Sequence, residues 1–149
     1  MSQQNIKQII KQEYLKCAKD PVYFMKKYCM IQHPTRGRIQ FNLYTFQEKV
    51  LSLLNKNERN IILKSRQLGI STLTAGMSLW YMLFQKDINV LVIATKQDTA
   101  KNLVTKVKFM YENLPSWLKL GFTENNKLAL RLKNGSQIKA VSAASDAGR

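Results

Sequence analysis

The chain has 149 residues, 45% hydrophobic and 22% charged, a composition typical of a folded globular domain and not of a disordered chain. It has no apolar run near the roughly 20 residues that a membrane-spanning helix needs, and its polar start lacks the apolar region of a signal peptide. Lysine and arginine outnumber aspartate and glutamate by 24 to 9, so the net charge of +15 favours contact with a polyanion such as nucleic acid. A solvated surface or an acidic partner subunit is the alternative explanation of that charge.

The two cysteines, Cys17 and Cys29, are too few for a disulfide framework and suit a reducing cytoplasm. Cys29 lies four residues before His33, but zinc prefers four protein ligands and only Cys17 is left to help. The sequence therefore does not predict a structural metal site.

Residues 1–44 are expected to form a helical and extended segment. Apolar side chains at near-helical spacing predict a helix over residues 3–19, and Asp20-Pro21 ends it and opens a second helix to about Tyr28. Residues 33–37 favour a turn, and the alternation over 39–43 predicts a short strand or an extended arm.

Residues 45–149 are expected to form an α/β domain. Its first helix begins at Thr45, the predicted cap, with Glu48 as the capping-box partner, and ends near Leu54. The elements expected next are a buried strand at 61–63, a deeply buried helix over about 70–84, a second buried strand at 89–94 and a helix over about 97–113.

Two consecutive β-α units with short joints predict a parallel sheet with flanking helices and right-handed crossovers. Asn134-Gly135, between apolar runs at 128–132 and 136–141, predicts a β-hairpin attached to that core.

The joint between the first strand and its helix is the candidate ligand site, because a helix N-terminus at the carboxyl end of a strand offers free N–H groups to phosphate. It reads Lys64-Ser65-Arg66-Gln67-Leu68-Gly69-Ile70-Ser71-Thr72. Against the pattern G-x-x-x-x-G-K-[ST], Gly69 matches the second glycine and Ser71 the magnesium-binding hydroxyl, but Ile70 stands where the lysine is expected.

Lys64 stands at the first glycine position, where its flexible side chain can reach phosphates from the base of the loop, and Arg66 adds a permanent charge. An ordinary turn in which Ser71 or Thr72 merely caps the helix is the alternative.

Ser65–Thr72 closely resembles the deviant Walker A segment of phage large terminases, some of which carry the working lysine at the start of the loop, as Lys64 does. The resemblance covers nearly the whole chain. Residues 20–24, 31–37 and 43–47 are similar to the segment before the terminase ATPase core, and residues 132–136 and 144–149 to the stretch leading toward Walker B.

The resemblance implies a P-loop NTPase-like fold that binds ATP and Mg²⁺. The nucleotide-binding residues it implies are Phe46, Gln47, Lys64, Ser65, Arg66, Gln67, Leu68, Gly69, Ile70, Ser71 and Thr72. Among these, Gln47 would hydrogen-bond the base edge with Phe46 packing nearby; the alternative is an exposed Gln47 and a core Phe46.

The resemblance also implies the catalytic roles. Lys64 would bind the phosphates, Arg66 a terminal phosphate and Ser71, helped by Thr72, the magnesium ion. Arg149 would sense or complete a site, on a neighbouring subunit.

For the full protein the resemblance implies a motor that moves double-stranded DNA into a procapsid in the cytoplasm of the infected cell. It would work as a homo-oligomeric ring with a portal and a small terminase subunit, and would also be an endonuclease. Two alternatives stay open: a helicase-like P-loop translocase, against which Ile70 counts, and a non-catalytic basic domain that binds nucleic acid.

Hydrolysis also needs carboxylates to help hold magnesium and to orient water. Neither expected strand ends in an acid, since Lys64 follows the first and Thr95 the second. We therefore expect an incomplete domain from the N-terminal part of a longer protein, not catalytically competent alone. Its sheet would lack central strands, leaving apolar surface uncovered and the chain prone to self-association.

Overall fold

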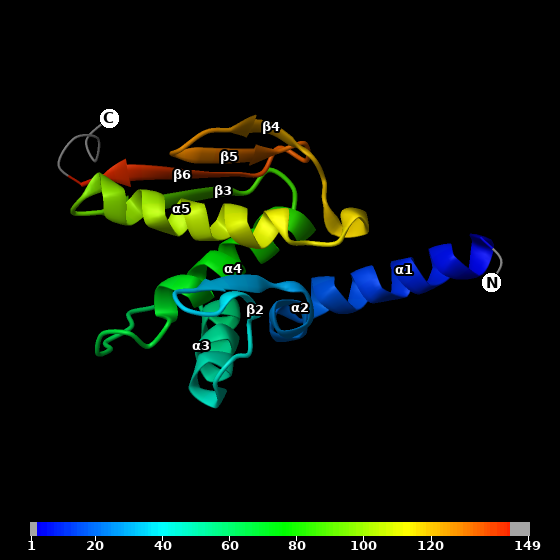
Figure 1. Ribbon diagram of the computed structural model, residues 1–149, viewed down its shortest axis with the longest axis horizontal. Helices are drawn as coiled ribbons and strands as arrows, with labels where there is room; N and C mark the ends of the chain where they lie inside the picture. Colours follow the sequence, from blue (N-terminus) through cyan, green and yellow to red (C-terminus); the bar gives the residue numbers. More distant parts are fainter. Residues whose placement is uncertain (1–2, 144–149) are drawn as a thin grey trace.

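The computed structural model describes residues 3–143, which form five α-helices, a short 3₁₀ helix and six strands (Figure 1). The α-helices are α1 (Gln3–Lys19), α2 (Pro21–Tyr28), α3 (Thr45–Lys56), α4 (Ile70–Phe84) and α5 (Gln97–Glu112), and the 3₁₀ helix is Ser116–Leu118. The strands are β1 (Met30–His33), β2 (Gly37–Gln40), β3 (Asn89–Ala94), β4 (Phe122–Asn125), β5 (Ala129–Leu132) and β6 (Gln137–Ser142).

The strands form two sheets. β1 and β2 make an antiparallel hairpin, and the larger sheet has the order β3-β6-β5-β4. β3 and β6 are parallel, from Asn89 opposite Gln137 to Ala94 opposite Ser142, and the other two pairs of neighbours in this sheet are antiparallel. The expected parallel sheet is thus a mixed one. The hairpin predicted at Asn134-Gly135 is confirmed as β5–β6, but it belongs to the main sheet instead of being attached to it.

The strand predicted at residues 61–63 is wrong. These residues form neither a helix nor a strand, and the side chains of Ile61 and Leu63 are fully exposed. A strand needs a neighbour to accept and donate its backbone hydrogen bonds, and β3, the strand expected beside it, pairs only with β6 within residues 3–143.

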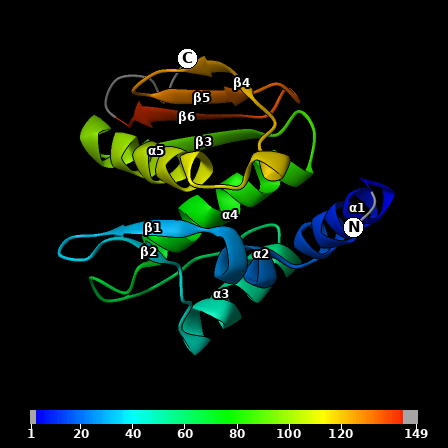
Figure 2. The ribbon, with the colours of Figure 1, turned by 45° about the vertical axis from the view of Figure 1, so that its right-hand side comes forward.

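The elements lie in layers (Figures 1 and 2). α5 packs against one face of the main sheet, α4 lies beneath α5, and the β1–β2 hairpin with α2 and α3 lies on the far side of α4. In the described part of the chain, no helix covers the other face of the sheet. Leu91 and Ile93 of β3 are 58% and 54% exposed there. β3 is therefore partly covered on one face and exposed on the other, not buried on both as expected, while the expected uncovered apolar surface is confirmed.

The core is centred on α4, as its apolar composition predicts. Nine of its residues are buried, among them Leu73, Leu79 and Met82. Its C-terminal end is held by the β5–β6 turn, where the Asn134 side-chain amide donates to the Met82 and Gln85 carbonyls at 2.8 and 2.9 Å. These bonds satisfy carbonyls that have no partner inside the helix.

Both cysteines are free thiols within this core. Burial raises the pKa of Cys17 to about 11 and also raises the pKa of Cys29. Within residues 3–143 no three His, Cys, Asp or Glu side chains gather as a metal site would require, and no helix there combines the length and apolarity needed to cross a membrane.

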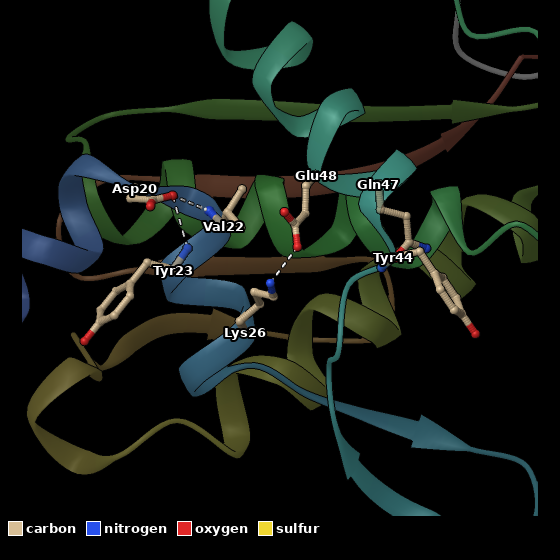
Figure 3. Close-up of polar contacts among 7 residues, drawn as sticks. All are labelled: Asp20, Val22, Tyr23, Lys26, Tyr44, Gln47 and Glu48. Atoms are coloured by element: carbon tan, nitrogen blue, oxygen red, sulfur yellow. Dashed lines mark hydrogen bonds and ion pairs between the residues drawn. The ribbon is translucent and has the colours of Figure 1, made fainter.

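The boundary between α1 and α2 follows the prediction. Asp20 caps α2 by accepting hydrogen bonds from the backbone N–H groups of Val22 and Tyr23 (Figure 3), and Pro21 occupies the first turn. The Glu13 carboxylate on α1 then accepts hydrogen bonds from Lys27 and Tyr23, both at 2.6 Å, and from Tyr28 at 2.7 Å. This cluster fixes α1 against α2.

The helix predicted from Thr45 is α3, but the capping residues differ from the prediction. Tyr44 is the N-cap, and the Gln47 side chain accepts its backbone N–H at 3.0 Å. Glu48 instead forms an ion pair with Lys26 of α2 at 2.6 Å (Figure 3). The cap lies one residue earlier than expected because Gln47, one position before Glu48, can reach back to the free N–H.

Candidate phosphate-binding site

The candidate site is the loop that leads into α4. Residues 64–69 are exposed and non-helical. Gly69 is the N-cap of α4 with a φ of 69°, and no side chain of the described residues caps the helix. This φ is in the left-handed region, where a side chain is disfavoured and glycine is not. The N-terminus of α4 therefore presents backbone N–H groups that Ser71 and Thr72 do not cap, which is the arrangement that binds anions.

Gln47 of α3 holds this loop in place. Its Nε2 donates to the Leu68 carbonyl at 3.0 Å while its Oε1 accepts from the Tyr44 N–H, and the side chain is only 2% exposed. A Cβ added to Gly69 would lie 2.8 Å from Gln47 Nε2, so the two residues fit closely. The alternative of an exposed Gln47 is thus wrong, and its assignment to the base edge stays a prediction.

Two exposed aromatic rings lie beside Gln47. Tyr44 is 67% exposed and Phe46 39% exposed, and their rings stack at 5.8 Å between centroids with an angle of 8° between planes. Phe46 is therefore not a core residue. Sequence reasoning missed Tyr44, and the available signal was an aromatic residue two positions before Phe46, directly before the helix. Exposed rings of this kind offer a stacking surface for a planar ligand.

The charged residues of the loop are free to meet a ligand. Lys64 and Arg66 are exposed, and in the described part of the chain neither forms an ion pair. Ser71 is exposed in the first turn of α4, and Thr72 is half-buried. Both cations belong to the segment that leads into α4, whose N-terminus attracts an anion through the helix dipole.

The burial of Ile70 explains why an apolar residue stands at the position where the motif usually has a lysine. Its side chain is buried in the hydrophobic core, so this position does not point a side chain toward the open end of the helix. The structure brings Gln47 against Leu68 and Gly69 at the start of α4, while residues 64–67 lie in the exposed segment before them. Arg149 and the motif at residues 144–149 lie outside the described residues.

Comparison with known proteins identifies the family and the fold. A family profile described as "Terminase large subunit, T4likevirus-type, N-terminal" matches residues 61–149, more than half of the chain. The crystal structure of the HK97 bacteriophage large terminase is similar with a TM-score of 0.67 and 18% sequence identity, over 89% of this chain and 28% of that chain. At this identity the structural likeness shows the fold alone, and the chain spans little more than a quarter of the length of that terminase. The chain belongs to the terminase large subunit family, and the part of the family that it matches is the N-terminal region.

Proposed function

We propose that this chain supplies the ATP-binding part of a viral DNA-packaging motor with a P-loop NTPase-like core. The observation that carries the proposal is the start of α4: its N-terminus has no side-chain cap among the described residues, Gly69 gives the left-handed entry, and Gln47 holds the loop from α3. The exposed cations Lys64 and Arg66 complete the chemistry that a triphosphate needs.

ATP and Mg²⁺ fit these residues. Backbone N–H groups of residues 65–70 would surround the phosphates, Lys64 would neutralise their charge and Arg66 would bind the terminal phosphate. Ser71, which is exposed, would contribute one oxygen ligand to Mg²⁺, with Thr72 beside it. When bound, the metal ion would neutralise charge that develops on the phosphates.

The nucleoside would lie against α3. The exposed rings of Tyr44 and Phe46 offer a stacking surface for the base. Gln47 uses one Nε2 hydrogen on the Leu68 carbonyl and its Oε1 on the Tyr44 N–H. We propose that its second Nε2 hydrogen reads the base edge.

Hydrolysis requires groups beyond these. Neither parallel strand ends in an acidic residue, since Thr95 follows β3 and Ala143 follows β6. The carboxylates that help hold magnesium and orient water would come from outside residues 3–143, with Arg149 completing a site on a neighbouring subunit. We therefore propose nucleotide binding, and not turnover, for this chain alone.

In the full protein, ATP turnover would drive double-stranded DNA into a procapsid within the infected cell. The ring of subunits, the portal, the small terminase subunit and the endonuclease activity belong to this proposal, which rests on family membership and on the net charge of +15.

The test is the affinity for Mg-ATP of the chain and of its Lys64→Ala variant. We expect Lys64→Ala to weaken binding about tenfold or more, because a charge-assisted hydrogen bond is worth roughly 1.5–3 kcal/mol. Lys56→Ala, an exposed lysine at the end of α3, is the matched control and should leave affinity unchanged. Equal affinity of the Lys64→Ala variant and the parent chain would contradict the assignment and favour a basic nucleic-acid-binding domain with a vestigial loop.

A further inference from the structure

A cavity of about 410 Å³ lies between the β1–β2 hairpin, α5 and the first turn of α4. α5 contacts β1 directly, and Thr72 in the first turn of α4 lines the cavity together with them. This volume is in the range of small-molecule sites. Of the candidate site residues 64–72, Thr72 is the one among those that line it, so the cavity is adjacent to the candidate ATP site and largely built from other elements.

The walls of the cavity are held together. Arg38 of the hairpin donates to the Asn113 side chain at the end of α5 at 2.8 Å. Asn113 in turn donates to the Phe109 carbonyl at 2.7 Å, so the last turn of α5 is fixed where it meets the hairpin. A site with fixed walls loses little conformational entropy when a ligand binds.

The polar lining of the cavity favours an anion. The His33 ring accepts backbone N–H bonds from Thr35 at 3.3 Å and Arg36 at 3.2 Å, both at Nδ1, which leaves Nε2 as the ring nitrogen available to a ligand. Lys106 of α5 adds a full positive charge. Among the described residues that line the cavity, none carries a carboxylate.

The remaining lining selects the shape of that anion. Phe109 and its apolar neighbours form a surface on which a flat ring can lie, and the amide of Asn102 stands one helical turn before Lys106 on the same face of α5. A fatty acid would fill the apolar part and leave the amide without a partner. A base with a phosphate satisfies the ring surface, the amide and the cation together.

We propose that this cavity binds a nucleoside monophosphate unit, with the phosphate at Lys106 and His33, and the base against Phe109 within reach of Asn102. The unit is either a free mononucleotide or one nucleotide of a single nucleic-acid strand. The cavity is a second site, and its occupation does not depend on ATP binding at Lys64.

The experiment is a titration of the ¹⁵N-labelled chain with deoxyadenosine monophosphate, followed by amide chemical shifts. We expect the shifts to concentrate on residues 102–109 and 32–33. Lys106→Ala should weaken binding about tenfold, the usual loss for a charged hydrogen bond. Asn102→Asp, which keeps the shape and adds a negative charge, should weaken it at least as much.

Lys101→Ala is the matched control, because Lys101 is on the same helix but roughly 140° around its axis from Lys106. Equal loss in Lys101→Ala and Lys106→Ala would mean attraction by charge alone and would overturn the proposal. So would shifts confined to residues 64–72, or displacement of the mononucleotide by a saturating non-hydrolysable ATP analogue with Mg²⁺. Conversely, Lys64→Ala should lose affinity for Mg-ATP and keep its affinity for the mononucleotide. This result would show that the two sites are separate.

A short single-stranded oligonucleotide distinguishes the two sources of the ligand. Tighter binding than the mononucleotide, lost in Asn102→Asp, identifies a strand as the occupant. Affinity equal to that of the mononucleotide identifies a free nucleotide. Each result supports the proposal, whereas an oligonucleotide that binds equally well to the parent chain and to Asn102→Asp contradicts it.

Discussion

At the scale of single residues, Gly69 and Gln47 determine the shape of the candidate phosphate loop. Gly69 takes a left-handed φ, and its missing side chain leaves the space that the Gln47 amide occupies. The sequence motif predicts that glycine is required at position 69, since the Walker-like pattern has a glycine there. The contact between Gln47 and the Leu68 carbonyl joins residues 21 positions apart, and no local pattern predicts such a contact.

Replacing Gly69 by alanine should destabilise the chain in two ways. The left-handed φ costs about 1 kcal/mol for a residue with a side chain, and the new Cβ would displace Gln47 Nε2. Gly37→Ala is the matched control, because Gly37 has a φ of 67° and a Cβ added there would meet no described atom within 4 Å. Urea unfolding should show a larger decrease in the free energy of unfolding for Gly69→Ala than for Gly37→Ala. Equal decreases would mean that the contact with Gln47 does not contribute to stability.

At the scale of elements, the boundaries that depend on local chemistry follow from the sequence, and the pairings do not. α4 and β3 have the predicted bounds because apolar periodicity and chain breaks are local signals. β1 and β4 were missed because neither Met-Ile-Gln-His nor Phe-Thr-Glu-Asn alternates apolar and polar residues, and β4 is exposed throughout. The strand at 61–63 failed for the opposite reason: its composition is that of a strand, but a strand also requires a partner.

The junction of α1 and α2 should depend on pH through Glu13. Hydrogen bonds from Lys27, Tyr23 and Tyr28 lower the pKa of Glu13 from 4.5 to about 2. Because the folded-state pKa lies below the unfolded one, the stabilisation is complete above about pH 4.5 and is lost as the pH falls toward 2.

Glu13→Gln should therefore cost about 1–2 kcal/mol at pH 7, and the difference from the parent chain should shrink as the pH falls toward 2. Thermal unfolding across that pH range measures the effect. Glu48→Gln is the control, since its pair with Lys26 is partly exposed on both sides and should contribute little at any pH. A constant difference between Glu13→Gln and the parent chain from pH 7 to pH 2 would contradict the cluster's role.

At the scale of the whole molecule, the main sheet is covered on one face and open on the other within residues 3–143. The sequence predicted an α/β domain with uncovered apolar surface, but not the strand order. Pairing β3 with β6 brings together Asn89 and Gln137, which are 48 residues apart. Where the candidate site residues lie along the fold follows more directly from the sequence, because most belong to one continuous segment, residues 64–72, and their roles stay predictions.

The open face should make the chain self-associate at high concentration, because Leu91 and Ile93 place adjacent apolar side chains in water. Replacing both by threonine keeps the strand propensity and removes the apolar surface. We expect sedimentation equilibrium to show a concentration-dependent average mass for the parent chain and a monomer for the double variant. A parent chain that stays monomeric at all concentrations would show that this surface does not drive association.

α4 is anchored at both of its ends, by the loop at Gly69 and by the side chain of Asn134. A helix of 15 residues is a stiff rod about 22 Å long. We therefore expect the loop and the β5–β6 turn to be mechanically coupled through α4. A ligand that shifts the helix along its axis at Gly69 would displace the hairpin by a similar amount. The main sheet would then move when a ligand binds at the loop, although it does not contact the ligand.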